Sequence, residues 1–338
     1  MNIGAVPGAA PAILRRSAAA PANARERAQA TALVQAVLRA EEGSVVAEQP
    51  AIWSAGATGD LRVRRDGGQI AAAAAIVARD AVTPRGRIRL GLIGCVATSP
   101  DARGRGHGRA LLEICEDDLR AAGCAAALLW ADVPEFYSRC GYEACGAEVV
   151  LTIPKVDLPD LRACALYRPS YLGALECLRL AKPAHSERPR SESACHFGSP
   201  GAVVAVHRSP SGTINGYAAL GRGSDFIGTI HEWAGTPEVV LTLVAFLQKQ
   251  LELSETFLVT SVYDEPLGTF LQNAGVKPVL GPLGMAKALD PAALAAIATP
   301  AVGSDDSTLL RSVLGEPVAP LCTGTVPLYP HLSGFDSI

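Results

Sequence analysis

The sequence predicts an α/β fold with a mixed α+β sheet, and three observations predict it. Hairpin-like pairs of strands precede residue 98. An arginine- and glycine-rich loop then leads from a strand-like run into a helical run that begins near Arg109. The same order of strand and helix signals returns after residue 200. Hairpins supply antiparallel pairs and a strand–helix–strand crossover supplies a parallel pair, so one sheet is expected to contain both kinds of pairing.

The first half of the chain contains five strand-like runs, at residues 61–65, 69–79, 87–98, 125–130 and 148–153. Turn residues separate the first three runs, at Asp66-Gly67-Gly68 and Pro84-Arg85-Gly86, and such residues favour tight turns between strands. The second run is rich in alanine, which has a weak preference for strands, yet it follows a turn and predicts a strand. A helix follows the third run and ends near Gly123.

Residues 103–108, which read Arg-Gly-Arg-Gly-His-Gly, lie between the third strand and this helix. Glycine lacks a Cβ, so main-chain N–H groups can close around a phosphate. The helix N-terminus adds partial positive charge, and arginine adds a fork of donors. The spacing fits neither the dinucleotide-binding Gly-x-Gly-x-x-Gly pattern nor the P-loop, which ends in Gly-Lys-Ser or Gly-Lys-Thr. The stretch predicts a site for a pyrophosphate-bearing ligand; the alternative is an exposed basic turn that only caps the helix.

The pattern Arg103-x-x-Gly106-x-Gly108 resembles the acyl-CoA loop of the N-acetyltransferase superfamily usually called GNAT. Residues 136–143, Phe-Tyr-Ser-Arg-Cys-Gly-Tyr-Glu, resemble the family's second signature, in which Phe-Tyr opens a short helix and Gly-Tyr closes it. The order of strands and helices also resembles the family's core. The resemblance implies a GNAT fold, acetyl-CoA as co-substrate, and direct transfer of an acetyl group, in a ternary complex, to a primary amine on a small molecule or a peptide.

From residue 202 the strand signals resume, in runs at 203–207, 214–220, 228–233, 256–261 and 278–289. A helix is expected from Pro237, because proline is favoured in a first helical turn and Val240, Leu243 and Leu247 then share one face. This repeats the order of the first half and predicts two tandem GNAT-like domains, with an unrelated α+β domain as the alternative. Trp233-Ala234-Gly235-Thr236-Pro237 replaces the arginine–glycine loop, so the second copy is not expected to hold CoA.

We expect four regions: a catalytic domain with the acetyl-CoA site at residues 1–155, a linker and helix at 156–199, a degenerate second domain at 200–290, and a C-terminal tail at 291–338 that packs on the body. Within the second region, residues 184–199 are polar and predict a surface loop, whose two histidines lack carboxylates in register for a metal. The tail is expected to pack because its apolar and aromatic residues are unlike those of a frayed end.

The resemblance also implies roles for single residues. Main-chain N–H groups would hold the pyrophosphate at Arg103, Gly104, Arg105, Gly106, His107, Gly108 and Arg109. The pantetheine amides would pair with the splayed end of the third strand, as an added strand does, at Val96, Ala97 and Thr98. A main-chain N–H near Val96 would stabilise the oxyanion. Tyr137 lies where GNAT enzymes commonly place a tyrosine that protonates the leaving thiolate, and a packing tyrosine is the alternative.

The attacking amine must lose a proton, which a carboxylate or a histidine could accept. The Eis-like acetyltransferases, which this chain resembles in its tandem layout, place their C-terminal carboxylate in the active site, and this implies a possible role as base for Ile338. Their additional sterol-carrier-like domain would not fit within 338 residues. The sequence does not rank the other candidates, which are Asp132, Glu135, His231 and Glu232.

Composition narrows the partners and the compartment. The net charge is −3 and the pI is near 6.1. The protein as a whole is therefore not attracted to nucleic acid or to an anionic membrane. No apolar run reaches the roughly 18–20 residues of a spanning helix. The nine cysteines form no Cys-x-x-Cys pair, so no metal is expected and reduced thiols indicate the cytoplasm. Cys95, on an expected buried strand, is interpreted as a small apolar filler.

Two alternatives to an acetyltransferase stay open. The first is a non-catalytic acyl-CoA-binding or sensing protein, since the loop at residues 103–108 is compatible with binding alone. The second, more remote, is a nucleotide-binding protein that uses the loop for phosphate. Neither the acceptor amine nor the oligomeric state can be predicted from this sequence.

Overall fold

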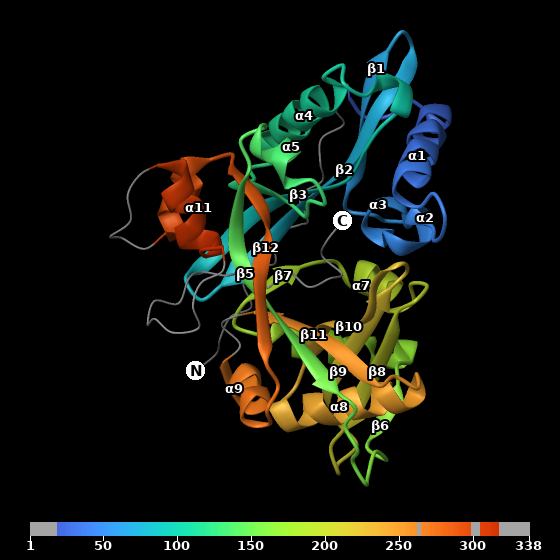
Figure 1. The fold of residues 1–338 in the computed structure, drawn as a ribbon, viewed down its shortest axis with the longest axis vertical. Helices are drawn as coiled ribbons and strands as arrows, with labels where there is room; N and C mark the ends of the chain where they lie inside the picture. Colours follow the sequence, from blue (N-terminus) through green and yellow to red (C-terminus); the bar gives the residue numbers. More distant parts are fainter. Residues whose placement is uncertain (1–18, 262–264, 299–304, 318–338) are drawn as a thin grey trace, which may run out of the picture.

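The computed structural model describes residues 19–261, 265–298 and 305–317, and shows two halves joined by one sheet (Figure 1). The first half comprises α1 (Ala24–Leu38), α2 (Val45–Glu48), α3 (Pro50–Trp53), β1 (Asp60–Asp66), β2 (Gln69–Thr83), β3 (Gly86–Thr98), the 3-10 turn η1 (Pro100–Ala102), α4 (His107–Ala121), β4 (Ala126–Leu129), α5 (Pro134–Ser138) and β5 (Glu143–Pro154). The rest of the chain comprises β6 (Cys164–Leu166), the 3-10 turn η2 (Pro169–Tyr171), α6 (Leu172–Leu180), β7 (His185–Glu187), α7 (Arg190–Phe197), β8 (Val203–Arg208), β9 (Ile214–Arg222), β10 (Asp225–Ala234), α8 (Pro237–Gln250), β11 (Glu255–Ser261), α9 (Glu265–Asn273), β12 (Pro278–Ala288), α10 (Pro291–Ile297) and α11 (Asp306–Leu314).

The strands form one mixed sheet, which confirms the predicted fold class. Among the described residues the order is β1-β2-β3-β4-β12-β5-β11-β10-β9-β8-β6, and β7 pairs with β2 outside this path. β1, β2 and β3 form the predicted antiparallel meander, and β3 pairs in parallel with β4 after the crossover through α4. β8, β9 and β10 repeat the meander, and β10 pairs in parallel with β11 after α8. The two halves therefore share one topology.

Helices cover both faces of β2, which explains its alanine run. The side chains of residues 72, 74 and 76 belong to the core beneath α4, and those of residues 73, 75 and 77 belong to the core beneath α1. All six are fully buried. Small side chains allow two helices to approach the same strand closely, so packing outweighs the weak strand preference of alanine at this position.

The second half repeats this layering. Val240, Leu243 and Leu247 of α8 pack on one face of its strands, as the apolar spacing of this helix predicts. Leu175 of α6 and Phe197 of α7 pack on the other face. Each half thus has its own hydrophobic core on both sides of the shared sheet.

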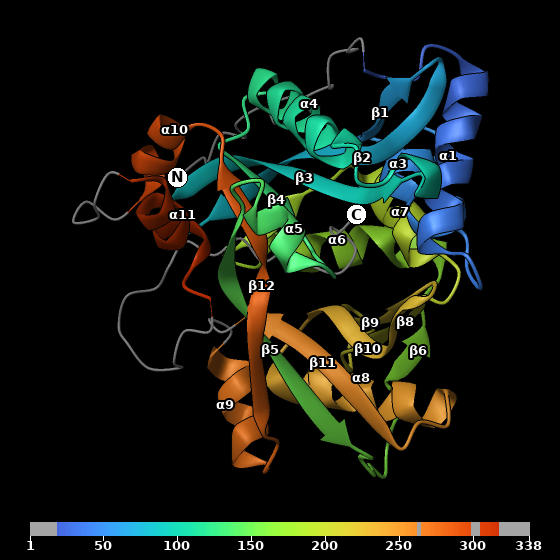
Figure 2. The same ribbon diagram turned by 45° about the horizontal axis from the view of Figure 1, so that its top comes forward.

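The last strand of each half pairs with the other half. β12 lies between β4 and β5, where Met285 is opposite both Leu129 and Ala144. β5 in turn lies between β12 and β11, and the two long strands run side by side from one half into the other (Figure 2). The strand expected at residues 278–289 therefore joins the first half as well as closing the second. Local sequence signals do not reveal this pairing.

Residues 184–199 were predicted to be a surface loop, and this was wrong. They form β7 and α7, and Glu192 of α7 is only 2% exposed. Arg79 of β2 binds the Glu192 carboxylate, Thr58 Oγ1 donates to it at 2.7 Å, and His196 Nε2 lies 3.4 Å away. A carboxylate is therefore in register with a histidine, contrary to the prediction. The segment is polar because its side chains pair with one another inside the protein.

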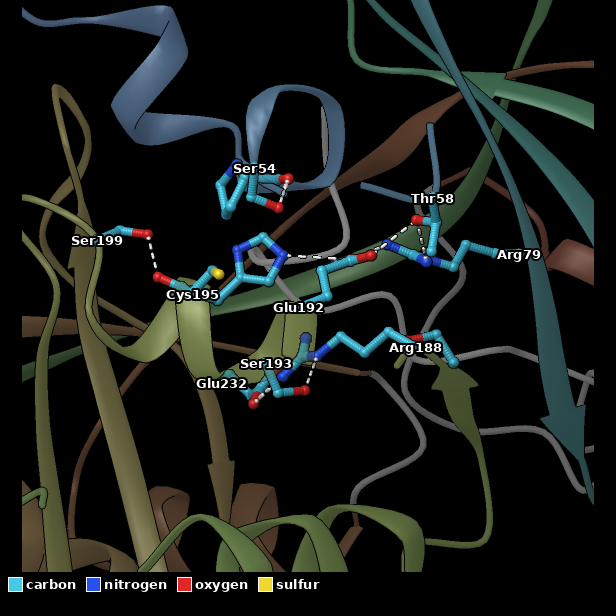
Figure 3. Close-up of polar contacts among 12 residues, drawn as sticks. Ser54, Thr58, Arg79, Arg188, Glu192, Ser193, Cys195, Ser199 and Glu232 are labelled. Atoms are coloured by element: carbon cyan, nitrogen blue, oxygen red, sulfur yellow. Dashed lines mark hydrogen bonds and ion pairs between the residues drawn. The ribbon is translucent and has the colours of Figure 1, made fainter. Parts of the chain in front are cut away.

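The same segment also binds the second half (Figure 3). Arg188 donates to Ser193 Oγ at 2.8 Å and to Glu232 Oε1 at 2.8 Å, and the Tyr217 hydroxyl donates to the same glutamate oxygen at 2.9 Å. Buried charges need partners of opposite sign, and each of these has one. α7 is therefore tied through charged side chains to β2 of the first half, and its neighbouring Arg188 to β10 of the second.

Two helices follow β12 and pack on the first half. Leu294 of α10 and Leu309, Leu310 and Val313 of α11 are buried in the core beneath α1. The main chain adds a hydrogen bond from Gly146 N to Gly315 O at 2.8 Å. The remainder of the predicted tail, residues 299–304 and 318–338, lies outside the described residues.

Candidate active site

A cavity of about 930 Å³ lies where β3 and β4 separate. The two parallel strands pair only as far as Leu92 and Leu128, and β3 then continues to Thr98 without a neighbouring strand on that side among the described strands. One wall is therefore formed by β3, at Ile93, Gly94, Cys95, Val96 and Thr98. The segment after β4 forms another wall, at Trp130, Asp132, Val133, Phe136 and Tyr137.

A β-bulge interrupts β3 within this wall. Gly94 is opposite Ala75 and Ala97 is opposite Ala73, so two residues of β3 face one residue of β2. Cys95, inside the bulge, has a φ of 51°, a left-handed conformation that residues other than glycine rarely adopt. A bulge takes main-chain groups out of the ladder, at the position where the sequence predicts an oxyanion donor near Val96. Burial raises the pKa of the Cys95 thiol to about 12, which favours a filler rather than a nucleophile.

The loop at residues 103–109 begins α4. Gly104 and Gly106 have φ values of 74° and 79°, and Gly106 is the N-cap of the 15-residue helix. A Cβ on either glycine would have no heavy atom of the described residues within 4 Å, so backbone conformation rather than crowding requires glycine. The helical bonds begin with Ala110 N donating to Gly106 O at 3.0 Å, so the amides of residues 107–109 project from the helix end. Such an end, carrying the positive pole of the helix, can bind an anion.

Most of the predicted coenzyme-binding residues meet at this cavity. Eight of the ten line it: Val96, Thr98, Arg103, Gly104, Gly106, His107, Gly108 and Arg109. Ala97 is buried in the core beneath α1 instead. The Arg105 side chain turns to the β1–β2 turn, where its Nη2 lies 2.6 Å from Asp66 Oδ2, and His107 Nε2 lies 3.6 Å from the same oxygen. The side chain of Arg105 thus anchors the loop to the first hairpin.

Tyr137, the predicted general acid, lies in α5 and lines the cavity. Its ring packs edge to face on Phe136 and Tyr142, with centroids 5.0 Å and 6.1 Å away. Burial, and then electrostatic interactions with Asp132 and Cys140, raise the pKa of Tyr137 to about 12. The hydroxyl therefore stays protonated at neutral pH and can act as a donor. Its role in catalysis remains a prediction.

The predicted bases lie in different places. Asp132 lines the cavity, whereas Glu135 is exposed on α5 and does not. His231 is buried, its Nε2 lies 3.1 Å from Gly221 O, and burial lowers its pKa to about 4. Glu232 accepts hydrogen bonds from Arg188 and Tyr217, and neither it nor His231 lines the cavity. Ile338 lies outside the described residues, so its role stays a prediction.

Sequence reasoning missed a group of charged and aromatic residues that also line the cavity. Arg39 follows α1, and Arg222, Asp225 and Phe226 come from the β9–β10 hairpin of the second half. Asp225 Oδ2 accepts hydrogen bonds from Arg39 Nη2 at 2.8 Å and from Arg222 Nη2 at 3.0 Å. Arg39 Nε also donates to Glu48 Oε2 at 2.8 Å. Residues from both halves therefore form one cavity.

The hairpin packs tightly on the connection between α1 and α2. A Cβ on Gly223 would collide with the Glu48 side chain, and one on Gly43 would collide with Ser224 Oγ of the hairpin. Burial alone would lower the pKa of Arg39, but hydrogen bonds and attraction from Glu48 and Asp225 raise it. The sequence from Gly221 to Asp225 is typical of a turn and could have been predicted as one. Its contact with the first half depends on tertiary packing.

Comparisons with known proteins identify the class. Residues 19–145 match the family model described as an acetyltransferase (GNAT) domain. The structure is similar to a protein of unknown function from Enterococcus faecalis described as a probable N-acyltransferase, with a TM-score of 0.63 and 17% identity over 79% of this chain and 71% of that one. A GCN5-related N-acetyltransferase from Anabaena variabilis gives a TM-score of 0.61 and 15% identity, covering 81% and 73%. Eis1 from Mycobacterium abscessus gives a TM-score of 0.55 and 17% identity, over 81% of this chain and 74% of that one. No curated protein matches the sequence.

The match over residues 19–145 contains both signatures and confirms, for that part of the chain, the resemblance to the GNAT family. The described residues have the GNAT fold, and the similarity to Eis1 supports a two-domain layout.

Other features of the described residues bear on the kind of site. No helix in these ranges is both long and apolar enough to cross a membrane. No group of three or more metal-binding side chains occurs within them. The eight cysteines of this part of the chain are all free thiols.

Proposed function

We propose that the protein transfers an acetyl group from acetyl-CoA to a primary amine within a ternary complex. The observation that carries this proposal is that one cavity contains the loop before α4, the unpaired end of β3 and Tyr137. The loop would bind the pyrophosphate of the coenzyme, the end of β3 would pair with the thioester arm, and Tyr137 would protonate the leaving thiolate.

Main-chain groups would do most of the coenzyme binding. The N–H groups of residues 103–109 would donate to the pyrophosphate, with Arg103 and Arg109 at the same wall of the cavity. The pantetheine amides would pair with β3 at residues 96–98, on the side where β4 has diverged. This places the thioester carbonyl beside the bulge at Cys95 and Val96, whose displaced N–H would stabilise the oxyanion.

The transfer then requires two proton movements. The amine nitrogen attacks the thioester carbon, and the carbonyl oxygen becomes an oxyanion. The carbon–sulfur bond breaks, and the Tyr137 hydroxyl donates its proton to the departing sulfur. The proton lost by the amine goes to a carboxylate or to solvent, and Asp132 is the predicted base that lines the cavity. The products are an N-acetyl amine and free CoA.

Tyr137→Phe tests this assignment, because it removes one hydroxyl from the cavity wall. The kcat should fall about 100-fold. It is measured with a panel of amines, with a thiol-reactive dye to detect the free CoA that is released. The Kd for CoA should stay within about twofold, since the pyrophosphate loop is untouched. Tyr142→Phe is the matched control: Tyr142 is buried against Tyr137 but does not line the cavity, so kcat should hardly change.

The alternative is an acyl-CoA-binding or sensing protein. CoA binding without turnover on any amine would favour it, as would a Tyr137→Phe variant with an unchanged rate. Competition between CoA and ATP would reveal a nucleotide site, which the proposal predicts to be absent.

A further inference from the structure

Where the second half lines the cavity, the carboxylate of Asp225 pairs with two arginines. The side chains of Arg222 and Arg39 are 4% and 15% exposed, whereas that of Asp225 is 33% exposed. Both arginines bind Oδ2 of Asp225, so neither bond uses Oδ1. Arg39 is also paired with Glu48. Of these four charged side chains, that of Asp225 is the most exposed.

Apolar side chains line the same cavity as this carboxylate. Phe226 and Trp130 line the cavity, and aliphatic side chains line it beside Arg39, at Val37, Leu38 and Val45. Val133 also lines it and is 57% exposed. Together these side chains give the cavity an apolar wall beside a few polar groups, a combination typical of small-molecule sites.

The backbone at Phe226 gives an independent indication of function. Its φ is 56°, a conformation that is strained for a bulky residue. The ring is held 4.8 Å from the His231 ring, and the Arg222 guanidinium lies 5.3 Å from its centroid. Strain of this kind concentrates at ligand-binding sites, where the surrounding structure maintains it.

We propose that the acceptor is a primary amine on an apolar body without a carboxylate, and that Asp225 binds its ammonium form. This inference rests on the acetyltransferase function proposed above and names its substrate class. Alkylamines are protonated at neutral pH, so the ammonium is the form that arrives. It must release one proton to a carboxylate or to solvent before its nitrogen attacks the thioester. Phe226, Trp130 and Val133 would cover the apolar body.

The same arrangement disfavours two other classes of amine. An amino acid would bring its own carboxylate close to Asp225, and like charges repel strongly where water is partly excluded. A small polar amine would leave Val133 and Phe226 uncovered. Its binding free energy would lack about 25 cal/mol for each Å² of apolar surface that a larger ligand would bury.

Three amines test the substrate class on the unmodified protein: 2-phenylethylamine, phenylalanine and ethanolamine, each with acetyl-CoA. Phenylalanine adds a carboxylate to 2-phenylethylamine, and ethanolamine replaces its ring with a hydroxyl. We expect kcat/KM for 2-phenylethylamine to exceed that for each of the others by about tenfold or more.

Asp225→Asn then tests the carboxylate itself. The KM for 2-phenylethylamine should rise about tenfold with a smaller change in kcat, and the preference over phenylalanine should narrow to about threefold or less, because the repulsion is gone. Glu135→Gln is the control, since Glu135 is an exposed carboxylate of α5 that does not line the cavity. It should leave that preference unchanged, and both variants should bind CoA as the wild type does.

The outcomes separate the two proposals. Equal or better use of phenylalanine or ethanolamine by the wild type would overturn the substrate class and leave the transferase function standing. If kcat/KM falls equally for 2-phenylethylamine and for phenylalanine in Asp225→Asn, the role of Asp225 would be overturned. Retained CoA binding without turnover of any amine would overturn the transferase function, and this inference with it. Should Asp225→Asn fail to fold, the wild-type comparison decides.

Discussion

The N-termini of α4 and α8 occupy equivalent positions in the two halves, each after the third strand of a meander and before a parallel partner. Before α4, a Cβ on Gly104 or Gly106 would meet no heavy atom within 4 Å. Before α8, a Cβ on Gly235 would lie 3.0 Å from Val239 Cγ1 and 3.2 Å from Gly216 Cα. The first position is therefore open to a ligand, whereas packed protein atoms fill the second.

Trp233 of β10 lies just before this second position in the chain and is buried in the core of the second half. It is 3% exposed, and its indole Nε1 donates to Val259 O of β11 at 3.3 Å, so the side chain bridges β10 to β11. Lys182 Nζ lies 3.5 Å above its ring. One topology can thus support either a ligand cavity or a packed core, depending on a few residues at the strand end. We propose that the second half is a degenerate copy that holds no coenzyme.

The largest effect is expected from Gly106→Glu. A carboxylate in front of the α4 N-terminus would occupy the pyrophosphate position and repel it, so the affinity for CoA should fall about 1000-fold, or about 4 kcal/mol. Calorimetry measures this. Gly212→Glu is the matched control, because Gly212 also has a positive φ, 83°, and open space around it, but lies in the β8–β9 turn. Normal CoA binding by Gly106→Glu would show that the loop is not the site.

Trp233→Ala addresses the packed position. Removing a buried tryptophan should lower the free energy of unfolding by about 3 kcal/mol, measured by chemical denaturation. CoA should still bind with unchanged affinity at one site per chain, because the cavity of the first half is untouched. A second CoA site in this variant would show that Trp233 alone blocks binding. Loss of the first site would contradict the separation of the two positions.

The contribution of Glu192 to folding stability should depend on pH. Burial by itself raises the pKa of Glu192, but hydrogen bonds from His196 and Thr58 and the charge of Arg79 lower it to about 2. In the unfolded chain the pKa of a glutamate is about 4.3. The ionised carboxylate of Glu192 therefore stabilises the folded state above that pH. This contribution is lost as the pH falls toward 2.

Glu192→Gln should therefore be less stable than the wild type by about 2 kcal/mol at pH 6, and the difference should shrink below about pH 4. Urea unfolding at several pH values measures it. Glu187→Gln, which removes a partly exposed partner of Arg87, should change stability by less than about 1 kcal/mol. A difference for Glu192→Gln that does not vary with pH would contradict an origin in the charge of this carboxylate.

The sequence predicted elements whose signals are local. The expected strand at residues 87–98 is β3 at Gly86–Thr98, and the helix expected from Pro237 is α8. The insertion of β12 between β4 and β5 could not be predicted, because strand alternation carries no information about a distant partner. α7 was missed because polar composition was taken to mean exposure, whereas Glu192 and Arg188 are buried as pairs.

The candidate site divides in the same way. The loop at residues 103–109 and the end of β3 are contiguous in the chain, so one motif located most of that wall. The bulge at Cys95 was not predicted, since its backbone conformation depends on the pairing with β2. Arg222, Asp225 and Phe226 reach the cavity only because the second half folds against α1 and α2, and no local pattern marks them.

Hydrogen exchange of the unmodified protein, with and without acetyl-CoA, tests the central comparison most directly. The first amides of both α4 and α8 lack helical partners, so each should exchange quickly in the free protein. Acetyl-CoA is predicted to slow exchange at residues 104–109 and to leave residues 235–239 unchanged. Protection at residues 235–239, or at neither position despite saturating coenzyme, would contradict the account.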